Sequence, residues 1–304
     1  MRIGLSGGGS NIDRMVEQAK SAEAAGFTSL WYAGATAGDP LAVIAVVGRE
    51  TTGIELGTSV VQTYPVHPLM QAQRAAATAM AAGRGFTLGV GPSHAPVIEG
   101  LYGLSYDHAG RHTEEYTTIL TRALAGQAVD FEGEDFRVRT GARPPGTAAP
   151  VSVLIAALGK RLLRVAGQMA DGTVCWMANA RAIERHVGPR IRKAAADAGR
   201  PEPRIVAGLP VAVHSDLSEA RKAAGEQFAG YGVLPNYRRI LDIGEAPGPA
   251  EAAIAGDEAT VRKEIQNLFD AGATDVWAAI FAVGTDRAAS RQRTRALLEE
   301  LVAA

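Results

Sequence analysis

Short apolar strand patterns alternate eight times with helical patterns along the 304 residues of this chain. Each strand pattern is apolar throughout, which is typical of strands buried on both faces of a parallel sheet. Eight such strand–helix units predict an α/β fold, a closed (β/α)8 TIM barrel. The expected strands are 2–6, 29–34, 55–61, 86–91, 151–157, 172–177, 205–214 and 275–281, and the expected helices are 12–24, 40–50, 68–82, 110–124, 160–170, 181–198, 257–271 and 285–301.

The length and composition fit one barrel domain over residues 1–304, because 47% of the residues are hydrophobic and barrels of this size are common. A net charge of −1 disfavours nucleic acid or an anionic membrane as the main partner. Cys175 is the only cysteine, which excludes an intramolecular disulfide and a cysteine-cluster metal site. No signal-peptide pattern opens the chain, and the apolar run 41–47 is too short to span a bilayer, so we expect a cytoplasmic protein.

Three segments are longer than ordinary connections. Residues 92–112 follow the fourth strand, residues 129–138 read as a hairpin, and residues 215–256 follow the seventh strand. Insertions after barrel strands lie over the active face, so the third segment, with Tyr231 and Tyr237, is either a substrate-covering lid or an ordinary surface excursion. Glycine is expected to end a helix in the left-handed backbone conformation just before the next strand. The sequence places such glycines at Gly26, Gly83, Gly199 and Gly272.

Two blocks carry most of the functional information. Residues 54–61 and 83–94 each read as a buried strand that runs into glycine and small polar residues at its carboxyl end. Ligands of parallel α/β folds bind where strands end, and small residues there let the backbone approach a flat ligand. This pattern predicts a cofactor enzyme.

The same blocks resemble a known superfamily. The stretch LGTSVV…HPLMQAQRAAATAMAAGRGFTLGVGPSH, together with GFTSLWYAG and PVSVLIAALGKRLLRVAGQMADGTVCW, resembles the bacterial luciferase-like superfamily, and within it the coenzyme F420-dependent oxidoreductases. The resemblance covers roughly the first two thirds of the chain. It implies a barrel that binds a tricyclic ring at the carboxyl ends of its strands and transfers hydride between F420 and an organic substrate, usually as a homodimer.

The resemblance also implies where the cofactor lies. A non-prolyl cis peptide is expected in a bulge at Ser59–Val60, against the back of the ring. The loop before the fifth helix is expected to receive the phosphate-bearing tail, since its helix N-terminus and Lys160 would attract an anion. The expected cofactor-binding residues are Ser59, Val60, Gly91, Ser93, His94, Ala156, Ala157, Leu158, Gly159, Lys160 and Trp176.

His94 is the candidate catalytic residue. It follows Gly91-Pro92-Ser93 at the expected barrel mouth and aligns with an acid used for proton transfer in the family's sugar-phosphate dehydrogenases. It could transfer a substrate proton, or it could only contact the cofactor. The second strand ends Tyr32-Ala33-Gly34-Ala35, where those dehydrogenases have an acid–histidine pair, so either a different substrate or a reductase that starts from reduced cofactor is expected. Trp176 ends a strand and suits a ring-pocket wall, whereas Trp31 lies mid-strand and suits the core.

Other chemistries are disfavoured. His108, His112 and Glu115 have helical spacing, but two histidines without an HExxH motif make a metal site a weak hypothesis, and no metal is expected. The glycines of residues 6–10 and 89–91 do not complete a Rossmann fingerprint, and no G-x-S-x-G elbow occurs. The remaining alternatives are an FMN-dependent monooxygenase or flavin reductase, a non-catalytic flavin-binding protein and, more distantly, a metal-dependent hydrolase.

Overall fold

The computed structural model describes residues 1–9, 11–142 and 149–304. In this part of the chain, parallel strands close into a barrel because β10 pairs with both β9 and β12, and β12 pairs with β1. The predicted barrel is therefore confirmed. Its strands in order around the ring are β1 (Ile3–Gly7), β2 (Ser29–Tyr32), β3 (Glu55–Thr58), β5 (Phe86–Gly91), β8 (Val151–Ile155), β9 (Gly172–Trp176), β10 (Arg204–Val213) and β12 (Asp275–Ile280).

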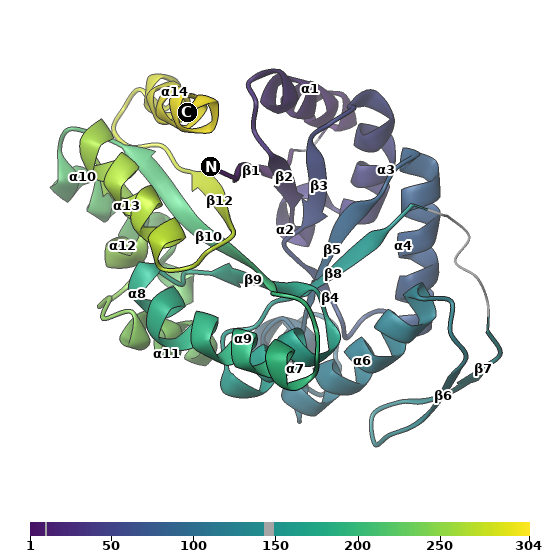
Figure 1. Cartoon of the computed structure of the whole chain (residues 1–304). Helices are drawn as coiled ribbons and strands as arrows, with labels where there is room; N and C mark the ends of the chain where they lie inside the picture. Colours follow the sequence, from purple (N-terminus) through teal and green to yellow (C-terminus); the bar gives the residue numbers. More distant parts are fainter. Residues whose placement is uncertain (10, 143–148) are drawn as a thin grey trace.

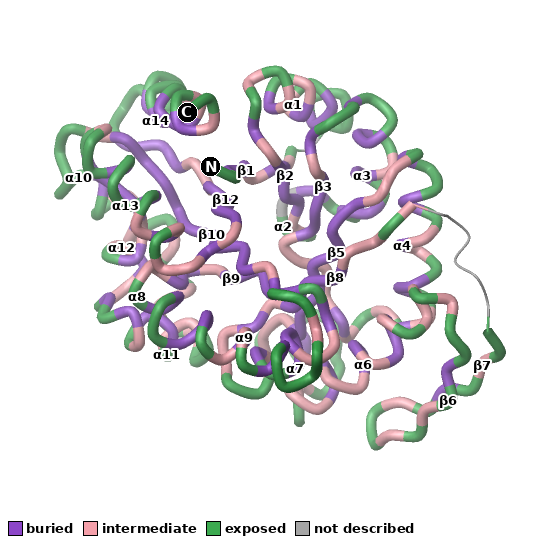
Figure 2. The backbone as a smooth tube through the Cα atoms, in the orientation of Figure 1, coloured by how far each residue is buried: buried purple, intermediate pink, exposed green. Residues whose placement is uncertain are grey.

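Helices surround this ring of strands (Figure 1), and Figure 2 shows the strands buried while the outer helix faces are exposed. Several helices begin where the sequence indicates. For example, the Asp39 side chain caps the second predicted helix by accepting a hydrogen bond from the Leu41 N–H, and Pro40 is the first residue of that helix. The surrounding helices are α1 (Ile12–Ala24), α3 (Pro40–Glu50), α4 (Pro68–Ala82), α6 (Ala109–Leu124), α7 (Lys160–Met169), α9 (Gly188–Asp197), α13 (Glu258–Asp270) and α14 (Arg287–Ala303).

The third predicted strand is not continuous. It ends at Thr58, passes through a cis Ser59–Val60 peptide and resumes as β4 (Val61–Gln62), which pairs with β5. The second strand stops at Tyr32, and Gly34–Ala37 forms the short helix α2 instead of strand. Predicted helix 181–198 is also divided, into α8 (Ala180–Ala182), a π-helical turn (Ile183–Val187) and α9, because Pro189 lacks an N–H and cannot continue the ladder.

The three long segments are structured. Residues 92–112 contain α5 (Ala95–Gly100), and the predicted hairpin is β6 (Val129–Glu132) with β7 (Arg137–Thr140). One Glu115 carboxylate on α6 accepts three N–H groups of the hairpin turn at 2.9–3.0 Å. The segment after β10 folds into α10 (Leu217–Gln227), a 3₁₀ turn (Ala229–Gly232), α11 (Pro235–Ile243), α12 (Pro249–Ala252) and β11 (Ile254–Gly256), the last of which pairs with β10.

A network of ion pairs closes the barrel at the amino ends of its strands. Asp275 begins β12 and is 2% exposed at its side chain; it accepts from Arg204 Nη2 at 2.8 Å and Arg2 Nε at 2.8 Å. Glu55, at the start of β3, accepts from the same two arginines at 2.7 Å each and from Thr87 Oγ1. Four strands are therefore joined by charge-assisted hydrogen bonds beneath the core.

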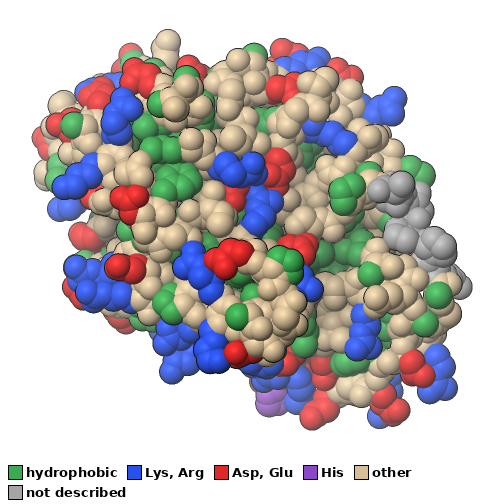
Figure 3. Space-filling view, in the orientation of Figure 1, with side chains coloured by type: hydrophobic (Ala, Val, Ile, Leu, Met, Phe, Trp, Pro, Cys, Tyr) green, Lys and Arg blue, Asp and Glu red, His purple; other side chains and the backbone are tan. Residues whose placement is uncertain are grey.

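Among the described residues, no helix is long and apolar enough to cross a membrane. The face in Figure 3 carries blue and red side chains interspersed, without one dominant sign. Ser10, the last residue of the glycine-rich segment considered above, lies outside the described residues.

Candidate active site at the carboxyl ends of the strands

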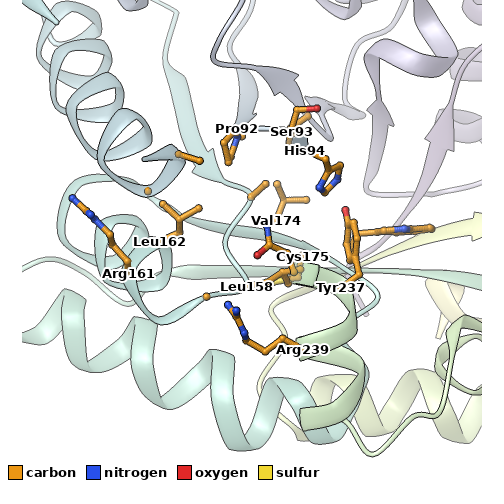
Figure 4. Close-up of a pocket in the computed structure, with 18 of the residues that line it drawn as sticks. Pro92, Ser93, His94, Leu158, Arg161, Leu162, Val174, Cys175, Tyr237 and Arg239 are labelled. Carbon is orange, nitrogen blue, oxygen red and sulfur yellow. The ribbon is translucent and has the colours of Figure 1, made fainter. Parts of the chain in front are cut away.

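A cavity of about 390 Å³ opens at the carboxyl ends of the barrel strands, a size that suits a small-molecule ligand (Figure 4). Every expected site residue except Ala157 lines it. The lining consists of Ser59, Val60, Gly91, Pro92, Ser93, His94, Tyr106, Ala109, Gly110, Ala156, Leu158, Gly159, Lys160, Arg161, Leu162, Val174, Cys175, Trp176, Asn236, Tyr237, Arg239 and Trp277.

The Ser59–Val60 segment forms one wall, and its peptide is cis, as the family resemblance implied. The Ser59 N–H donates to the Tyr32 carbonyl at 2.8 Å, which attaches this segment to β2. The Ser59 hydroxyl is buried and has no partner among the described residues. On the adjacent strand, a Cβ at Gly91 would lie 2.8 Å from the Ala156 Cβ, so glycine is needed for this close packing.

His94 lies at the cavity mouth on the segment that follows β5. The preceding Ser93 has φ of 63°, and its carbonyl accepts a hydrogen bond from the Tyr106 hydroxyl at 2.6 Å. The His94 ring is 5.2 Å from the Tyr237 ring between centroids, and in Figure 4 the hydroxyl end of Tyr237 points toward it. Burial lowers the pKa of His94, so its ring is neutral at pH 7 and can accept a proton.

The loop from Leu158 to Lys160 forms a second side of the cavity. Gly159 precedes α7 without a side-chain cap, so first-turn N–H groups are free to bind an anion. Arg239 Nη1 lies 3.9 Å from the position that a Cβ would take on Gly159. Ala157 was expected here, but it is fully buried and its N–H donates to Thr173 Oγ1 at 3.3 Å, so its role is in the core.

Aromatic side chains form the remaining wall. Trp176, at the end of β9, has its ring 5.1 Å from that of Trp277 and 5.7 Å from that of Tyr231. Trp31 is 1% exposed and donates from Nε1 to Ser29 Oγ, which agrees with its predicted place in the core. Burial raises the pKa of Cys175 to about 12, so this residue stays a thiol at neutral pH.

Sequence reasoning missed several lining residues. Trp277 is the third residue of the predicted eighth strand, where an aromatic indicates core, so the sequence carried no signal for its place in the cavity wall. Asn236, Tyr237 and Arg239 belong to α11, inside the segment considered as a lid, and they form part of the cavity wall. Tyr106 and Arg161 carried no signal in the sequence that could place them here.

The weak metal hypothesis finds no supporting geometry in the described ranges, where no three histidine, cysteine or acidic side chains gather. Glu115 binds the hairpin turn instead. The His112 ring stacks on Tyr64 at 3.8 Å between centroids and 6° between planes.

With this geometry in view, comparisons with known proteins show the family. The model of the luciferase-like monooxygenases matches residues 2–304, so the chain belongs to that family. Among its relatives is the F420-dependent hydroxymycolic acid dehydrogenase of Mycobacterium tuberculosis, 29% identical over 86% of this chain and 77% of that one. The F420-dependent glucose-6-phosphate dehydrogenase of Mycobacterium avium is 33% identical over 53% of this chain and 52% of the relative.

Solved structures with the same fold include the coenzyme F420-dependent tetrahydromethanopterin reductase of Methanopyrus kandleri. It superimposes with a TM-score of 0.74 at 20% identity, covering 98% of this chain and 97% of the other. The oxygenating component of a Baeyer–Villiger monooxygenase from Pseudomonas putida, in complex with FMN, superimposes with a TM-score of 0.72 at 18% identity, over 100% and 98% of the two chains. Both likenesses establish the barrel architecture.

Proposed function

We propose that this chain is a coenzyme F420-dependent oxidoreductase that transfers a hydride between the deazaflavin and a small organic substrate. The observation that carries the proposal is the convergence of the Ser59–Val60 wall, His94 and the free N-terminus of α7 on one cavity. Relatives named for F420, in Mycobacterium tuberculosis and Mycobacterium avium, support this cofactor. When bound, the deazaflavin supplies the hydride chemistry, and the protein orients it.

The residues present fit a planar ring with an anionic tail. The unpartnered Ser59 hydroxyl faces a buried environment and can hydrogen-bond a polar ring edge. Val60, Gly91 and Trp176 also line the cavity and would present apolar surface to the ring. The first turn of α7 and Lys160 would hold the phosphate of the tail.

His94 would move the substrate proton. Because its pKa is lowered by burial, the ring is neutral at pH 7 and can take a hydroxyl proton when the substrate is oxidised, returning it in reduction. None of the described residues hydrogen-bonds its ring nitrogens, so both are available within the cavity. The substrate differs from a sugar phosphate, since Ala33 and Gly34 replace the acid–histidine pair of those dehydrogenases.

A monooxygenase or flavin reductase that uses FMN is the second candidate, favoured by the FMN-bound Baeyer–Villiger neighbour. Equilibrium titration of purified protein with F420 and with FMN, followed by flavin fluorescence, tests the choice. We expect F420 to bind more tightly. Tight FMN binding together with oxygen uptake in the presence of reduced FMN would establish the second candidate, and failure of both ligands to bind would refute both.

The role of His94 is tested by a pair of variants, His94→Gln and His94→Ala. If His94 transfers a proton, His94→Gln retains cofactor affinity but loses roughly 10²-fold or more in kcat, together with the acid limb of its pH profile. If His94 only contacts the cofactor, the glutamine variant restores turnover as well as binding. Cofactor Kd measured beside kcat separates the two outcomes.

A further inference from the structure

The turn that connects β5 to His94 has an unusual backbone conformation at Ser93. This residue has φ of 63°, in the left-handed region that a residue with a side chain adopts only when its surroundings hold it there. His94, which follows directly, is extended, with φ of −138° and ψ of 149°. In Figure 4 the His94 ring extends from this turn toward Tyr237. Because the two residues are adjacent, the conformation of Ser93 determines in which direction the imidazole leaves the backbone.

Two side-chain hydrogen bonds hold the Ser93 turn. The Tyr106 hydroxyl donates to the Ser93 carbonyl at 2.6 Å, and Gln62 Nε2 donates to Ser93 Oγ at 3.3 Å. Gln62 belongs to β4, the short strand that follows the Ser59–Val60 wall. The bond from Tyr106 is the shorter of the two and acts on the backbone itself. It therefore constrains the conformation of the turn more directly than the bond from Gln62.

Tyr106 is itself held in place between α5 and α6. Its ring stacks on that of Tyr64, with 5.4 Å between centroids and 30° between planes. Its N–H donates to Glu99 Oε1 at 3.3 Å. Burial raises the pKa of Tyr106 to about 12, so the hydroxyl stays protonated near neutral pH and remains a hydrogen-bond donor. The insertion after β5 thus brings a fixed donor to the Ser93 carbonyl.

The backbone after His94 is fixed by different contacts. The His94 carbonyl accepts the N–H groups of Val97 and Ile98 at 3.0 Å each, in the first turn of α5. The ring packs against that of Tyr237, with 5.2 Å between centroids. Since these contacts act on the following backbone and on the ring, the Ser93 turn is what orients His94 from the preceding side.

We propose that Tyr106 is a positioning residue for His94, and that its hydrogen bond to the Ser93 carbonyl holds the turn that directs the imidazole into the cavity. This inference rests on the proposed function, in which His94 transfers a proton. Proton transfer requires the base within hydrogen-bonding reach of the reacting group, so a small displacement of the imidazole slows it. The insertion after β5 then supports catalysis as well as forming part of the cavity wall.

The first test needs neither cofactor nor substrate. Nuclear magnetic resonance follows the ring signal of His94, identified by its absence from the spectrum of His94→Gln, and gives the pKa. In the wild type, burial holds the pKa of His94 below its ordinary value. In Tyr106→Phe we expect the pKa to rise toward that value, because an imidazole released from the turn is more exposed to water. The signal of His186, which belongs to the π-helical turn, serves as the internal reference and should not change.

A matched control removes a hydroxyl from the neighbouring tyrosine. The Tyr64 ring stacks on that of Tyr106, and its hydroxyl is buried and has no partner among the described residues. Tyr64→Phe should therefore leave the pKa of His94 unchanged. An equal rise in Tyr64→Phe and Tyr106→Phe would show general loosening of the aromatic packing, and it would contradict the positioning role.

A double-mutant cycle then tests whether Tyr106 acts through His94, with propan-2-ol as the probe substrate and F420 as the hydride acceptor. Losing the contribution of one hydrogen bond should lower kcat of Tyr106→Phe roughly three- to tenfold. The Kd of F420 should stay within about twofold of the wild-type value. In the His94→Ala background the same substitution should change kcat by less than about twofold, because no imidazole remains to be positioned.

The outcomes separate the two proposals. An unchanged pKa of His94 in Tyr106→Phe would refute the positioning role. Equal losses of kcat in the wild-type and His94→Ala backgrounds would show that Tyr106 acts on the ligand directly, which also contradicts it. If F420 does not bind, or if His94→Ala turns over as fast as the wild type, the proposed function fails instead. The pKa comparison then still decides whether Tyr106 holds His94 in place.

Discussion

The ion-pair network at the amino end of the barrel allows a quantitative prediction for Asp275→Asn. The Asp275 side chain is 2% exposed and accepts hydrogen bonds from Arg204, Arg2 and Thr274, the last at 2.6 Å. The amide keeps the shape of the side chain but removes the charge that compensates Arg204. Removing one partner of a buried pair costs about 3–5 kcal/mol, and Glu55 remains as a second partner of Arg204, so we expect about 3 kcal/mol.

This loss corresponds to a measurable shift in melting temperature. An unfolding entropy of about 2.1 cal/mol/K per residue gives roughly 640 cal/mol/K for the chain, so about 3 kcal/mol lowers Tm by about 5 °C. Differential scanning calorimetry measures the shift. The control is Asp197→Asn, an exposed partner of Lys193 on α9, which should cost under about 1 kcal/mol. Equal shifts in the two variants would refute the reasoning.

The same variant has a characteristic pH dependence. Burial alone would raise the pKa of Asp275, but the hydrogen bond and charge of Arg204, with Thr274 and Arg2, outweigh burial and hold it below its usual value. A carboxyl group whose pKa is lower in the folded than in the unfolded state stabilises the fold at pH values above its unfolded pKa of about 3.9. This stabilisation is lost as the pH falls through the pKa of the folded state. The stability difference between wild type and Asp275→Asn should therefore be constant from about pH 5 to 7 and shrink below about pH 4.

Three further predictions follow from the site and its support. Gly91→Val should abolish cofactor binding in a fluorescence titration, because even a Cβ would lie 2.8 Å from Ala156 and 3.1 Å from Val60; retained affinity would contradict the geometry. His94→Gln should lose turnover far more than affinity, with kcat and Kd measured together. Glu115→Gln should accelerate amide exchange at residues 134–136 without changing F420 affinity; unchanged exchange would show that its hydrogen bonds do not hold the hairpin.

Much of the fold was predictable because its signals are local. Continuous apolar strands mark buried parallel strands, and the helix–strand joints carry glycines that all adopt positive φ: Gly26, Gly83, Gly199 and Gly272. The interruption of the third strand could not be read from residue types, since Ser59 and Val60 are ordinary in a strand; only the family resemblance indicated it. The expected homodimer and the substrate remain predictions.

The site was predictable where it lies next to strand ends and not where it depends on packing. Ser59 lies near the end of one strand pattern, and His94 and Gly159 each follow another, so topology alone brings them together. Ala157 does not line the cavity, because its side chain is fully buried and its backbone N–H donates to Thr173 Oγ1. Tyr106, Tyr237 and Arg239 come from inserted helices, and their approach to the cavity depends on tertiary packing that no local pattern encodes.

A structure of the protein in complex with F420 tests the central claim most directly. We predict that the deazaflavin ring lies against the Ser59–Val60 wall, within hydrogen-bonding reach of the Ser59 hydroxyl and beside His94, with the phosphate at the first turn of α7. A ring bound outside this cavity, or a cavity filled by protein side chains in the complex, would contradict the account.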